Sequence, residues 1–243
     1  MSRLIRAMCL MLCILVLYLS GCTEPDQQTS QPAPQQPVHD TEGVIVAMGD
    51  SLTAGFGVAE EEAYPAQLER KLRAAGYPFR VINAGVSGET SSGARTRTEW
   101  MLTLKPDIVI LETGANDGLR GIDTTLTHQN IEAIVQTLTD RKVVVVLAGM
   151  QMVRNLGEAY TTAFAQMYPA VAKKHGLILV PFFLTGVAGD RTLNQSDGIH
   201  PTAEGHRIVV DNLYPHVLKA IHQLRARRTS LPPEKSGRSN KTT

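Results

Sequence analysis

The sequence predicts an α/β protein in which helices cover both faces of a parallel sheet. Short apolar runs alternate along the chain with longer segments whose apolar residues recur at helical spacing. One run, Val-Val-Val-Val-Leu-Ala at 143–148, is apolar throughout, which is typical of a strand buried on both faces. The 243 residues are enough for one domain with a substantial core.

The first predicted strand is the apolar run at 44–48, and a helix follows it. Pro65 in Ala63-Tyr64-Pro65 suits the first turn of that helix, where a missing N–H costs nothing. Leu68 and Leu72 recur at helical spacing, and Gly76 is the predicted C-terminal stop.

The remaining elements continue the alternation. The other predicted strands are 79–84, 107–112, 143–148 and 177–180. The helices predicted between and after them are 90–102, 124–139, 158–175 and 202–224. Strands that are separated by helices pair in parallel through crossover connections, so we expect one parallel sheet.

The N-terminus carries a targeting segment. Arg3 and Arg6 precede an apolar stretch at 7–19, which is too short for a confident membrane span. The following Leu19-Ser20-Gly21-Cys22 resembles a bacterial lipoprotein lipobox, in which cleavage precedes the cysteine and the cysteine is lipidated. The alternative is an ordinary secretory signal that contains a cysteine. A lipid on Cys22 would hold the protein on a membrane of the bacterial cell envelope, facing the periplasm.

Composition divides the chain into four parts. Residues 1–21 are the predicted lipoprotein signal peptide, and the Gln- and Pro-rich residues 22–42 are a disordered tether. Residues 43–224 form the predicted domain, and residues 225–243 are a disordered basic tail. A weak attraction of this tail to anionic phospholipids is the alternative to a simply solvated end.

Charge and cysteine content exclude several classes of function. The net charge of +1 gives no electrostatic field that would attract nucleic acid. We also expect the protein to be a monomer. All three cysteines precede residue 23, so the domain has no disulfide and no thiolate metal site. The histidines lack His-Glu-x-x-His spacing, which disfavours a metallohydrolase.

Polar motifs follow the predicted strands. These are Gly-Asp-Ser at 49–51, Asn-Ala-Gly-Val-Ser-Gly-Glu at 83–89, Gly-Ala-Asn-Asp at 114–117 and, near the C-terminus, Asp-Gly-Ile-His-Pro at 197–201. Open α/β sheets bind ligands at the carboxyl ends of their strands. These residue types are those that acyl transfer requires.

Ser51 is the candidate nucleophile, and His200 is the base that would accept its proton. Asp197 precedes His200 by three residues with a glycine between them, on a loop that can fold the carboxylate back onto the imidazole. That hydrogen bond would fix the tautomer and stabilise the imidazolium.

Three groups are candidate donors to the oxyanion of the reaction. They are the backbone N–H of Ser51, the unobstructed N–H of Gly88 and the side-chain amide of Asn116. The alternative for Asn116 is a turn residue beside Gly114. Asp50 is expected to brace the nucleophile loop through hydrogen bonds.

These four motifs, in this order, resemble the four blocks of the SGNH (GDSL) hydrolase superfamily. The resemblance extends from residue 43 to about 221 and covers nearly the whole predicted domain. It implies a three-layer α/β/α sandwich, the SGNH hydrolase fold, with a flavodoxin-like parallel sheet of strand order 2-1-3-4-5 and no metal or organic cofactor. In that family Ser51, Asp197 and His200 would be catalytic, and Ser51, Gly88 and Asn116 would form the oxyanion hole.

Further motifs resemble one branch of the superfamily, which contains bacterial arylesterases, acyl-CoA thioesterases and lysophospholipases. They are Asn-Asp-Gly-Leu-Arg-Gly at 116–121, Tyr168-Pro169 and Pro181-Phe182-Phe183. The resemblance implies a serine esterase that hydrolyses ester or thioester bonds through an acyl-serine intermediate.

Three other functions remain as alternatives. An α/β-hydrolase needs Gly-x-Ser-x-Gly, which Gly85-Val86-Ser87-Gly88-Glu89 fails at its last position. A non-catalytic envelope lipoprotein that binds an acyl ligand would not need the complete residue set. A carbohydrate O-acetyl esterase is disfavoured because aromatic residues are only 5% of the chain.

Two predicted loops, 118–123 and 150–157, flank the expected site. Their apolar residues predict an acyl-binding surface, with ordinary packing as the alternative. These residues are Leu119, Ile122, Met150, Met152 and Leu156.

Overall fold

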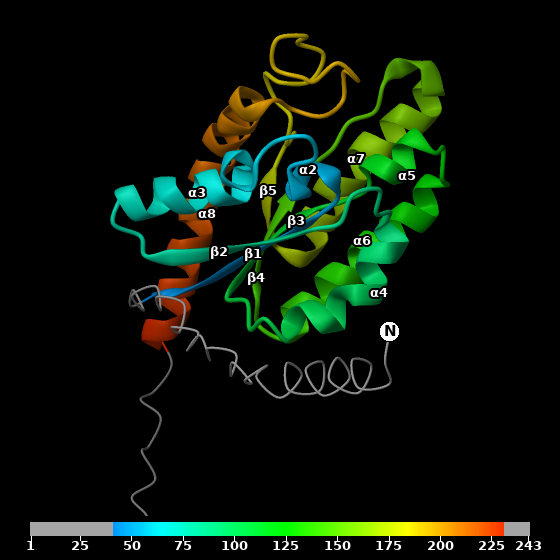
Figure 1. Cartoon of the computed structure of the whole chain (residues 1–243). Helices are drawn as coiled ribbons and strands as arrows, with labels where there is room; N and C mark the ends of the chain where they lie inside the picture. The colour runs from blue at the N-terminus through cyan, green and yellow to red at the C-terminus, as the bar shows by residue number, and fades with distance from the viewer. Residues whose placement is uncertain (1–40, 231–243) are drawn as a thin grey trace, which may run out of the picture. The chain divides into compact units, whose positions relative to one another are not determined.

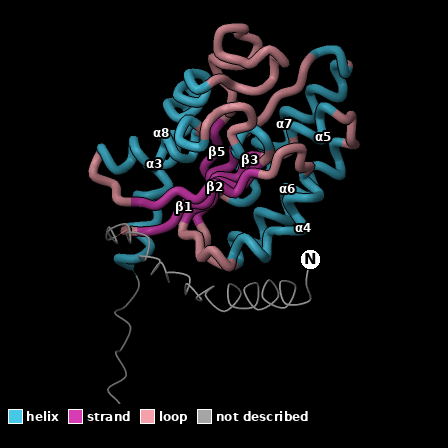
Figure 2. Tube along the Cα trace, viewed as in Figure 1, coloured by secondary structure: helices cyan, strands magenta, loops and turns pink. Residues whose placement is uncertain are grey.

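The computed structural model describes residues 41–230, and a five-stranded sheet lies at the centre of this part. The strands are β1 (Gly43–Gly49), β2 (Phe79–Gly85), β3 (Ile108–Glu112), β4 (Val144–Ala148) and β5 (Ile178–Val180). All neighbours pair in parallel in the order β2-β1-β3-β4-β5. Figures 1 and 2 show this sheet at the centre of the described part, between helices. The predicted fold class and strand order are therefore confirmed.

Helices cover both faces of this sheet. Helices α3 (Tyr64–Ala74) and α8 (Ala203–Ser230) pack together on one face. On the other face lie α4 (Ser91–Leu102), α6 (Thr124–Asp140) and α7 (Glu158–His175) (Figure 1). The short helices α2 (Ser51–Ala54) and α5 (Ala115–Leu119) follow β1 and β3, and the 3₁₀ turns are η1 (Glu60–Glu62) and η2 (Arg154–Leu156).

The core is formed by the central strands β1, β3 and β4. Nearly every side chain of these strands is buried, because helices pack against both of their faces. Continuous apolar sequence therefore marks these strands correctly. Among residues 41–230, no helix is both long enough and apolar enough to cross a membrane.

The domain boundary predicted at residue 224 is too early, because α8 continues to Ser230. Arg225 forms an ion pair with Glu42 at 2.6 Å, and Arg228 forms one with Asp107 at 2.7 Å. Arg228 also donates to the backbone oxygen of Glu42. These acids directly precede β1 and β3. Residues 225–230 therefore belong to α8, where Arg225 and Arg228 pair with acids that are distant in the sequence. The predicted signal peptide, most of the tether and residues 231–243 lie outside the described residues.

Candidate active site

The nucleophile candidate lies at a tight turn between β1 and α2. Asp50 is the N-cap of α2, and its Oδ1 accepts the N–H of Leu52 at 3.0 Å. Gly49 has no room for a side chain, because a Cβ there would lie 2.1 Å from Thr53 Oγ1. The turn therefore presents Ser51 at the carboxyl edge of the sheet.

The structure brings His200 and Asp197 to this serine. His200 Nε2 lies 2.8 Å from Ser51 Oγ, and His200 Nδ1 lies 2.7 Å from Asp197 Oδ2. Asp197 Oδ1 also accepts the N–H groups of Ile199 and His200 at 3.0 Å. The hydrogen bond from His200, followed by these backbone N–H groups, lowers the pKa of Asp197 to about 2. An ionised Asp197 favours the tautomer in which Nδ1 carries the proton and Nε2 accepts the Ser51 hydroxyl.

Two residues that sequence analysis missed support His200. The Phe56 ring lies 4.6 Å from the imidazole, centroid to centroid. Gln195 Nε2 donates to the backbone oxygens of Phe56 and Pro201, which ties the loop after α2 to the loop of Asp197 and His200. No sequence pattern marks these residues, since Phe56 lies far along the chain from both Gln195 and His200.

Gly88 and Asn116 line the same cavity as Ser51. Asn116 lies in α5 instead of a turn, and its Nδ2 donates to Asp50 Oδ2 at 3.1 Å, which fixes the amide beside the nucleophile. Gly88 has a φ of +78°, which favours glycine, and its carbonyl accepts a bond from Arg120. Within residues 41–230 the N–H groups of Ser51 and Gly88 donate to no protein acceptor.

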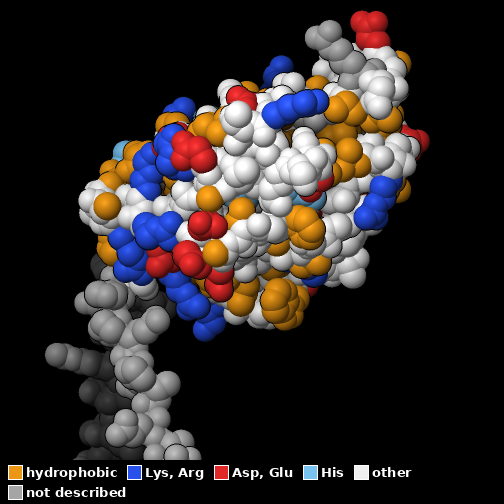
Figure 3. Space-filling view, turned by 45° about the horizontal axis from the view of Figure 1, so that its top comes forward, with side chains coloured by type: hydrophobic (Ala, Val, Ile, Leu, Met, Phe, Trp, Pro, Cys, Tyr) orange, Lys and Arg blue, Asp and Glu red, His pale blue; other side chains and the backbone are white. Residues whose placement is uncertain are grey.

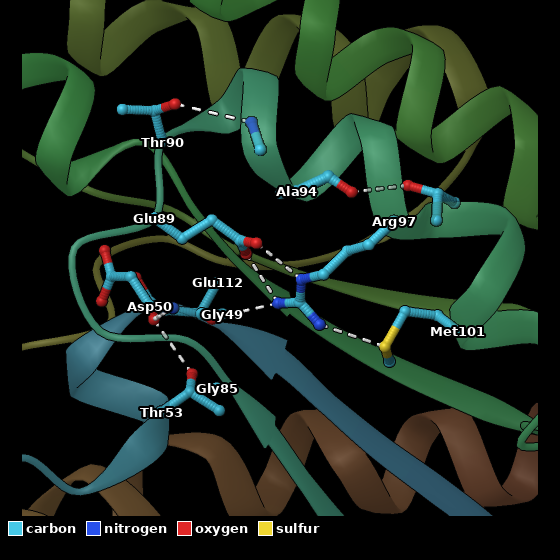
Figure 4. A network of polar contacts seen from close by, with 12 residues as sticks. Gly49, Asp50, Thr53, Gly85, Glu89, Thr90, Ala94, Arg97, Met101 and Glu112 are labelled. Carbon is cyan, nitrogen blue, oxygen red and sulfur yellow. Dashed lines mark hydrogen bonds and ion pairs between the residues drawn. The ribbon is translucent and has the colours of Figure 1, made fainter.

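A partly buried ion pair holds the loop of Gly88 in place. Arg97 on α4 binds Glu89 through two hydrogen bonds of 2.7 and 2.6 Å, and it also donates to the carbonyl of Gly49 (Figure 4). The same carbonyl accepts the N–H of Val86 at 2.9 Å. Arg97 thereby connects the residue after Gly88 to the end of β1.

Sequence analysis also missed a buried acid beneath the turn. Glu112, the last residue of β3, has no exposed surface, and its Oε2 accepts the N–H of Asp50 at 3.2 Å and the Thr53 hydroxyl at 2.9 Å (Figure 4). Burial raises the pKa of Glu112 well above its ordinary value. Burial likewise raises the pKa of Asp50.

A cavity of about 370 Å³ opens beside Ser51 and His200. Figure 3, which turns the top of Figure 1 toward the viewer, shows hydrophobic side chains in several places among charged and polar ones on this face. Of the five apolar residues predicted to flank the site, Leu119, Met150 and Met152 line the cavity, whereas Ile122 and Leu156 do not. Other apolar walls come from Leu52, Phe56, Val153, Phe182, Leu184 and Ile199.

Among residues 41–230, no group of three or more His, Cys, Asp or Glu side chains could hold a metal ion. The polar side chains that line the cavity include the Ser51 hydroxyl, the His200 imidazole, the Asp50 carboxyl group and the Asn116 amide. A serine bound to a histidine that is bound to an aspartate, at the edge of a parallel sheet, is the arrangement of a serine hydrolase.

A family model described as the GDSL-like Lipase/Acylhydrolase family matches residues 47–208. This chain belongs to that family and hydrolyses ester bonds as a serine hydrolase. The family predicted from the sequence motifs is confirmed.

Curated relatives agree with this assignment. Esterase TesA of Pseudomonas aeruginosa is 37% identical over 200 residues, which cover 82% of this chain and 96% of that protein. An arylesterase of Vibrio mimicus is 30% identical over 178 residues, 73% of this chain and 89% of that protein. Thioesterase 1/protease 1/lysophospholipase L1 of Escherichia coli strain K12 is 33% identical over 168 residues, 69% of this chain and 79% of that protein.

Solved structures share the fold. The crystal structure of TesA has a TM-score of 0.71 and 36% identity, and the match covers 73% of this chain and 99% of that chain. The structure of AlinE4, an SGNH-hydrolase family esterase, has a TM-score of 0.64 and 42% identity, with 75% and 98% covered.

Proposed function

We propose that Ser51, His200 and Asp197 are the catalytic residues of this esterase. The observation that supports the proposal is the continuous chain of hydrogen bonds, 2.8 Å from Ser51 to His200 and 2.7 Å from His200 to Asp197. In this mechanism Ser51 Oγ attacks the acyl carbonyl while His200 Nε2 takes the hydroxyl proton. His200 then gives that proton to the leaving alcohol or thiol, and an acyl-Ser51 ester remains.

Water hydrolyses the acyl-enzyme by the same steps. His200 removes a proton from the water, the hydroxide attacks the acyl carbonyl, and His200 returns the proton to Ser51 as the carboxylic acid leaves. Asp197 stays ionised throughout and stabilises the imidazolium.

The oxyanion site of this mechanism consists of the N–H groups of Ser51 and Gly88 and the amide of Asn116. Its support is that the two N–H groups have no protein acceptor among the described residues, and that Asp50 orients the amide. Donors that are already aligned stabilise a developing negative charge without reorganisation.

The proposed substrates are acyl esters and thioesters, including aryl esters, acyl thioesters and lysophospholipids. Two observations support this class: the cavity walls are largely apolar, and relatives are named arylesterase and thioesterase/lysophospholipase. An apolar cavity favours an acyl chain over the polar surface of an O-acetylated carbohydrate.

We also propose that the protein is a monomer, without a nucleic-acid partner, that is anchored to a bacterial envelope membrane through a lipid on Cys22. The lipobox-like Leu-Ser-Gly-Cys at 19–22 and the near-neutral net charge support these proposals. The active site would then face the periplasm.

The experiment is a hydrolysis panel of p-nitrophenyl esters of increasing chain length, acyl-CoAs and lysophospholipid, run on the wild type and on Ser51→Ala. The variant should keep its fold and lose several orders of magnitude in kcat. EDTA should leave the wild type active. Activity of Ser51→Ala near the wild-type rate would exclude Ser51 as the nucleophile.

A further inference from the structure

Two carboxyl groups are buried together beneath the nucleophile turn. Asp50 is 1% exposed and directly follows β1, and Glu112 is fully buried at the end of the neighbouring strand β3 (Figure 4). Neither group forms an ion pair with a Lys or Arg side chain among residues 41–230. Two negative charges in this position would repel one another in surroundings of low polarity.

The hydrogen bonds distinguish the two acids. Asp50 accepts from the N–H of Leu52 with one oxygen and from the amide of Asn116 with the other. Glu112 uses only Oε2, which accepts from the Asp50 N–H and from the Thr53 hydroxyl. Glu112 Oε1 is buried and has no partner among the described residues. An ionised oxygen without a donor is far more costly than a neutral one.

The surrounding groups also favour a neutral Glu112 beside an ionised Asp50. Burial and the negative charge of Asp50 raise the pKa of Glu112, whereas hydrogen bonds and the nearby His200 oppose the effect of burial on Asp50. Tyr64 on α3 and Tyr168 on α7 also face this pair, and burial raises the pKa of each phenol, so both stay neutral.

The remaining charged or titratable groups nearby are partnered or neutral. Arg97 on α4 is paired with Glu89 and reaches only the carbonyl of Gly49. His206 on α8 stacks against Tyr64, and burial lowers its pKa to about 4. At neutral pH these groups place no free positive charge on Glu112.

We propose that Glu112 is a positioning residue that acts as an uncharged carboxylic acid, accepting the N–H of Asp50 so that the Asp50 carboxylate alone carries negative charge and holds Asn116. Glu112 does not touch the cavity. It acts on the oxyanion site through Asp50, and this inference rests on the role proposed above for Asn116. It also gives a reason for glycine at 49, since a Cβ there would lie 2.5 Å from Glu112 Oε2.

The kinetic test compares Glu112→Gln with Glu112→Ala. Glutamine is uncharged and keeps one accepting oxygen, so kcat should stay within a few-fold of the wild type. Alanine removes the acceptor of the Asp50 N–H, so kcat should fall on the order of ten- to a hundredfold, with KM within a few-fold. Circular dichroism at the assay temperature establishes that each variant is folded.

The proposal is overturned if Glu112→Gln loses as much kcat as Glu112→Ala, or fails to fold, because a required negative charge would explain either result. A change in KM alone would also contradict it, since an oxyanion effect belongs to the transition state.

Infrared spectroscopy tests the charge without substrate. The difference spectrum of wild type minus Glu112→Gln at neutral pH should contain the carbonyl stretch of a protonated carboxylic acid, which shifts in D₂O. A carboxylate band in its place would refute the inference. The same comparison in the Ser51→Ala background separates the two proposals, because the acid band should persist there whether or not Ser51 is the nucleophile.

Discussion

Asn116 is the residue whose proposed role is most sharply testable. Its Nδ2 donates to Asp50 Oδ2 at 3.1 Å, and this hydrogen bond holds the amide beside Ser51. Asn116→Ala removes one proposed oxyanion donor and leaves Ser51 and His200 in place. We expect kcat to fall about a hundred- to a thousandfold, or about 2.7–4 kcal/mol of transition-state stabilisation. KM should change only a few-fold, since the carbonyl oxygen gains its charge in the tetrahedral state.

Steady-state kinetics on a p-nitrophenyl ester measure both constants. Asn212→Ala is the matched control, because this asparagine on α8 donates to the backbone of Thr185 and does not line the cavity. If Asn116→Ala raises KM alone, then Asn116 is a binding residue and the oxyanion site depends on backbone amides.

His206 gives a pH-dependent contribution to stability. Burial lowers its pKa from 6.5 to about 4, so between these values the unfolded chain binds a proton that the folded protein excludes. The stabilisation that comes from keeping His206 neutral is therefore fully present above pH 6.5 and is lost as the pH falls toward 4. The loss in the free energy of unfolding is about 3 kcal/mol at most. Buried Glu112, whose pKa is raised, contributes with the opposite sign.

A variant isolates the histidine. Neither ring nitrogen of His206 has a hydrogen-bond partner among the described residues, so His206→Leu should fold. Urea unfolding at pH 7 and at pH 4.5 should show a smaller loss of stability in the variant than in the wild type. Equal losses in both proteins would exclude His206 as the cause.

At the scale of elements, the Arg97–Glu89 pair joins α4 to the loop of Gly88 and to the end of β1. The side chains are only 15% and 8% exposed, so breaking the pair leaves a buried charge. We expect Arg97→Met to lower the free energy of unfolding by about 3–5 kcal/mol. It should also lower kcat, because the loop of Gly88, a proposed oxyanion donor, loses its support.

Urea denaturation measures this effect, and Arg141→Met is its control. Arg141 forms an ion pair with Glu99 in which both side chains are well exposed, 59% and 67%, so its loss should cost less than about 1 kcal/mol. In the double variant Arg97→Met/Glu89→Leu the stability should partly recover. If the double variant loses as much unfolding free energy as the two single variants added together, the two side chains are not directly coupled.

The elements show what the sequence could predict. Periodic and continuous apolar patterns identified all five strands, and α7 begins at Glu158 and ends at His175 as predicted. The triad candidates were accessible too, because Ser51 begins α2 just after β1, and Asp197 and His200 lie in the loop before α8. The structure brings the three side chains within hydrogen-bond distance, and their catalytic roles stay predictions for the experiments above.

Other features depend on contacts that no local pattern contains. A glutamate at the end of a strand usually faces solvent, yet Glu112 is buried because Asp50 and Thr53 supply its donors. Arg225 and Arg228 extend α8 because acids far away in the chain lie beside them. Such partners become visible only after folding brings distant segments together.

At the scale of the whole molecule, the proposed lipid anchor determines where the enzyme works. Cys22→Ser should abolish lipidation and release the protein from membranes, because the cysteine thiol is the proposed attachment point. The measurement is incorporation of labelled fatty acid in a bacterial host, together with fractionation of the membranes. Hydrolysis of a soluble ester by the purified variant should match the wild type. A wild type that takes up no label would contradict the anchor.

The bonds of Arg225 and Arg228 to Glu42 lie at the amino edge of the sheet, opposite the edge that carries Ser51. They bring the start of the first strand beside the end of the last helix. A domain whose first and last elements have neighbouring ends is suited to circular permutation. A short linker could join these two ends, and new termini could be opened at the exposed turn of Lys142 between α6 and β4. The order of segments in the gene is then separable from the geometry of the folded protein, since the permuted chain would keep Ser51, Asp197 and His200 together.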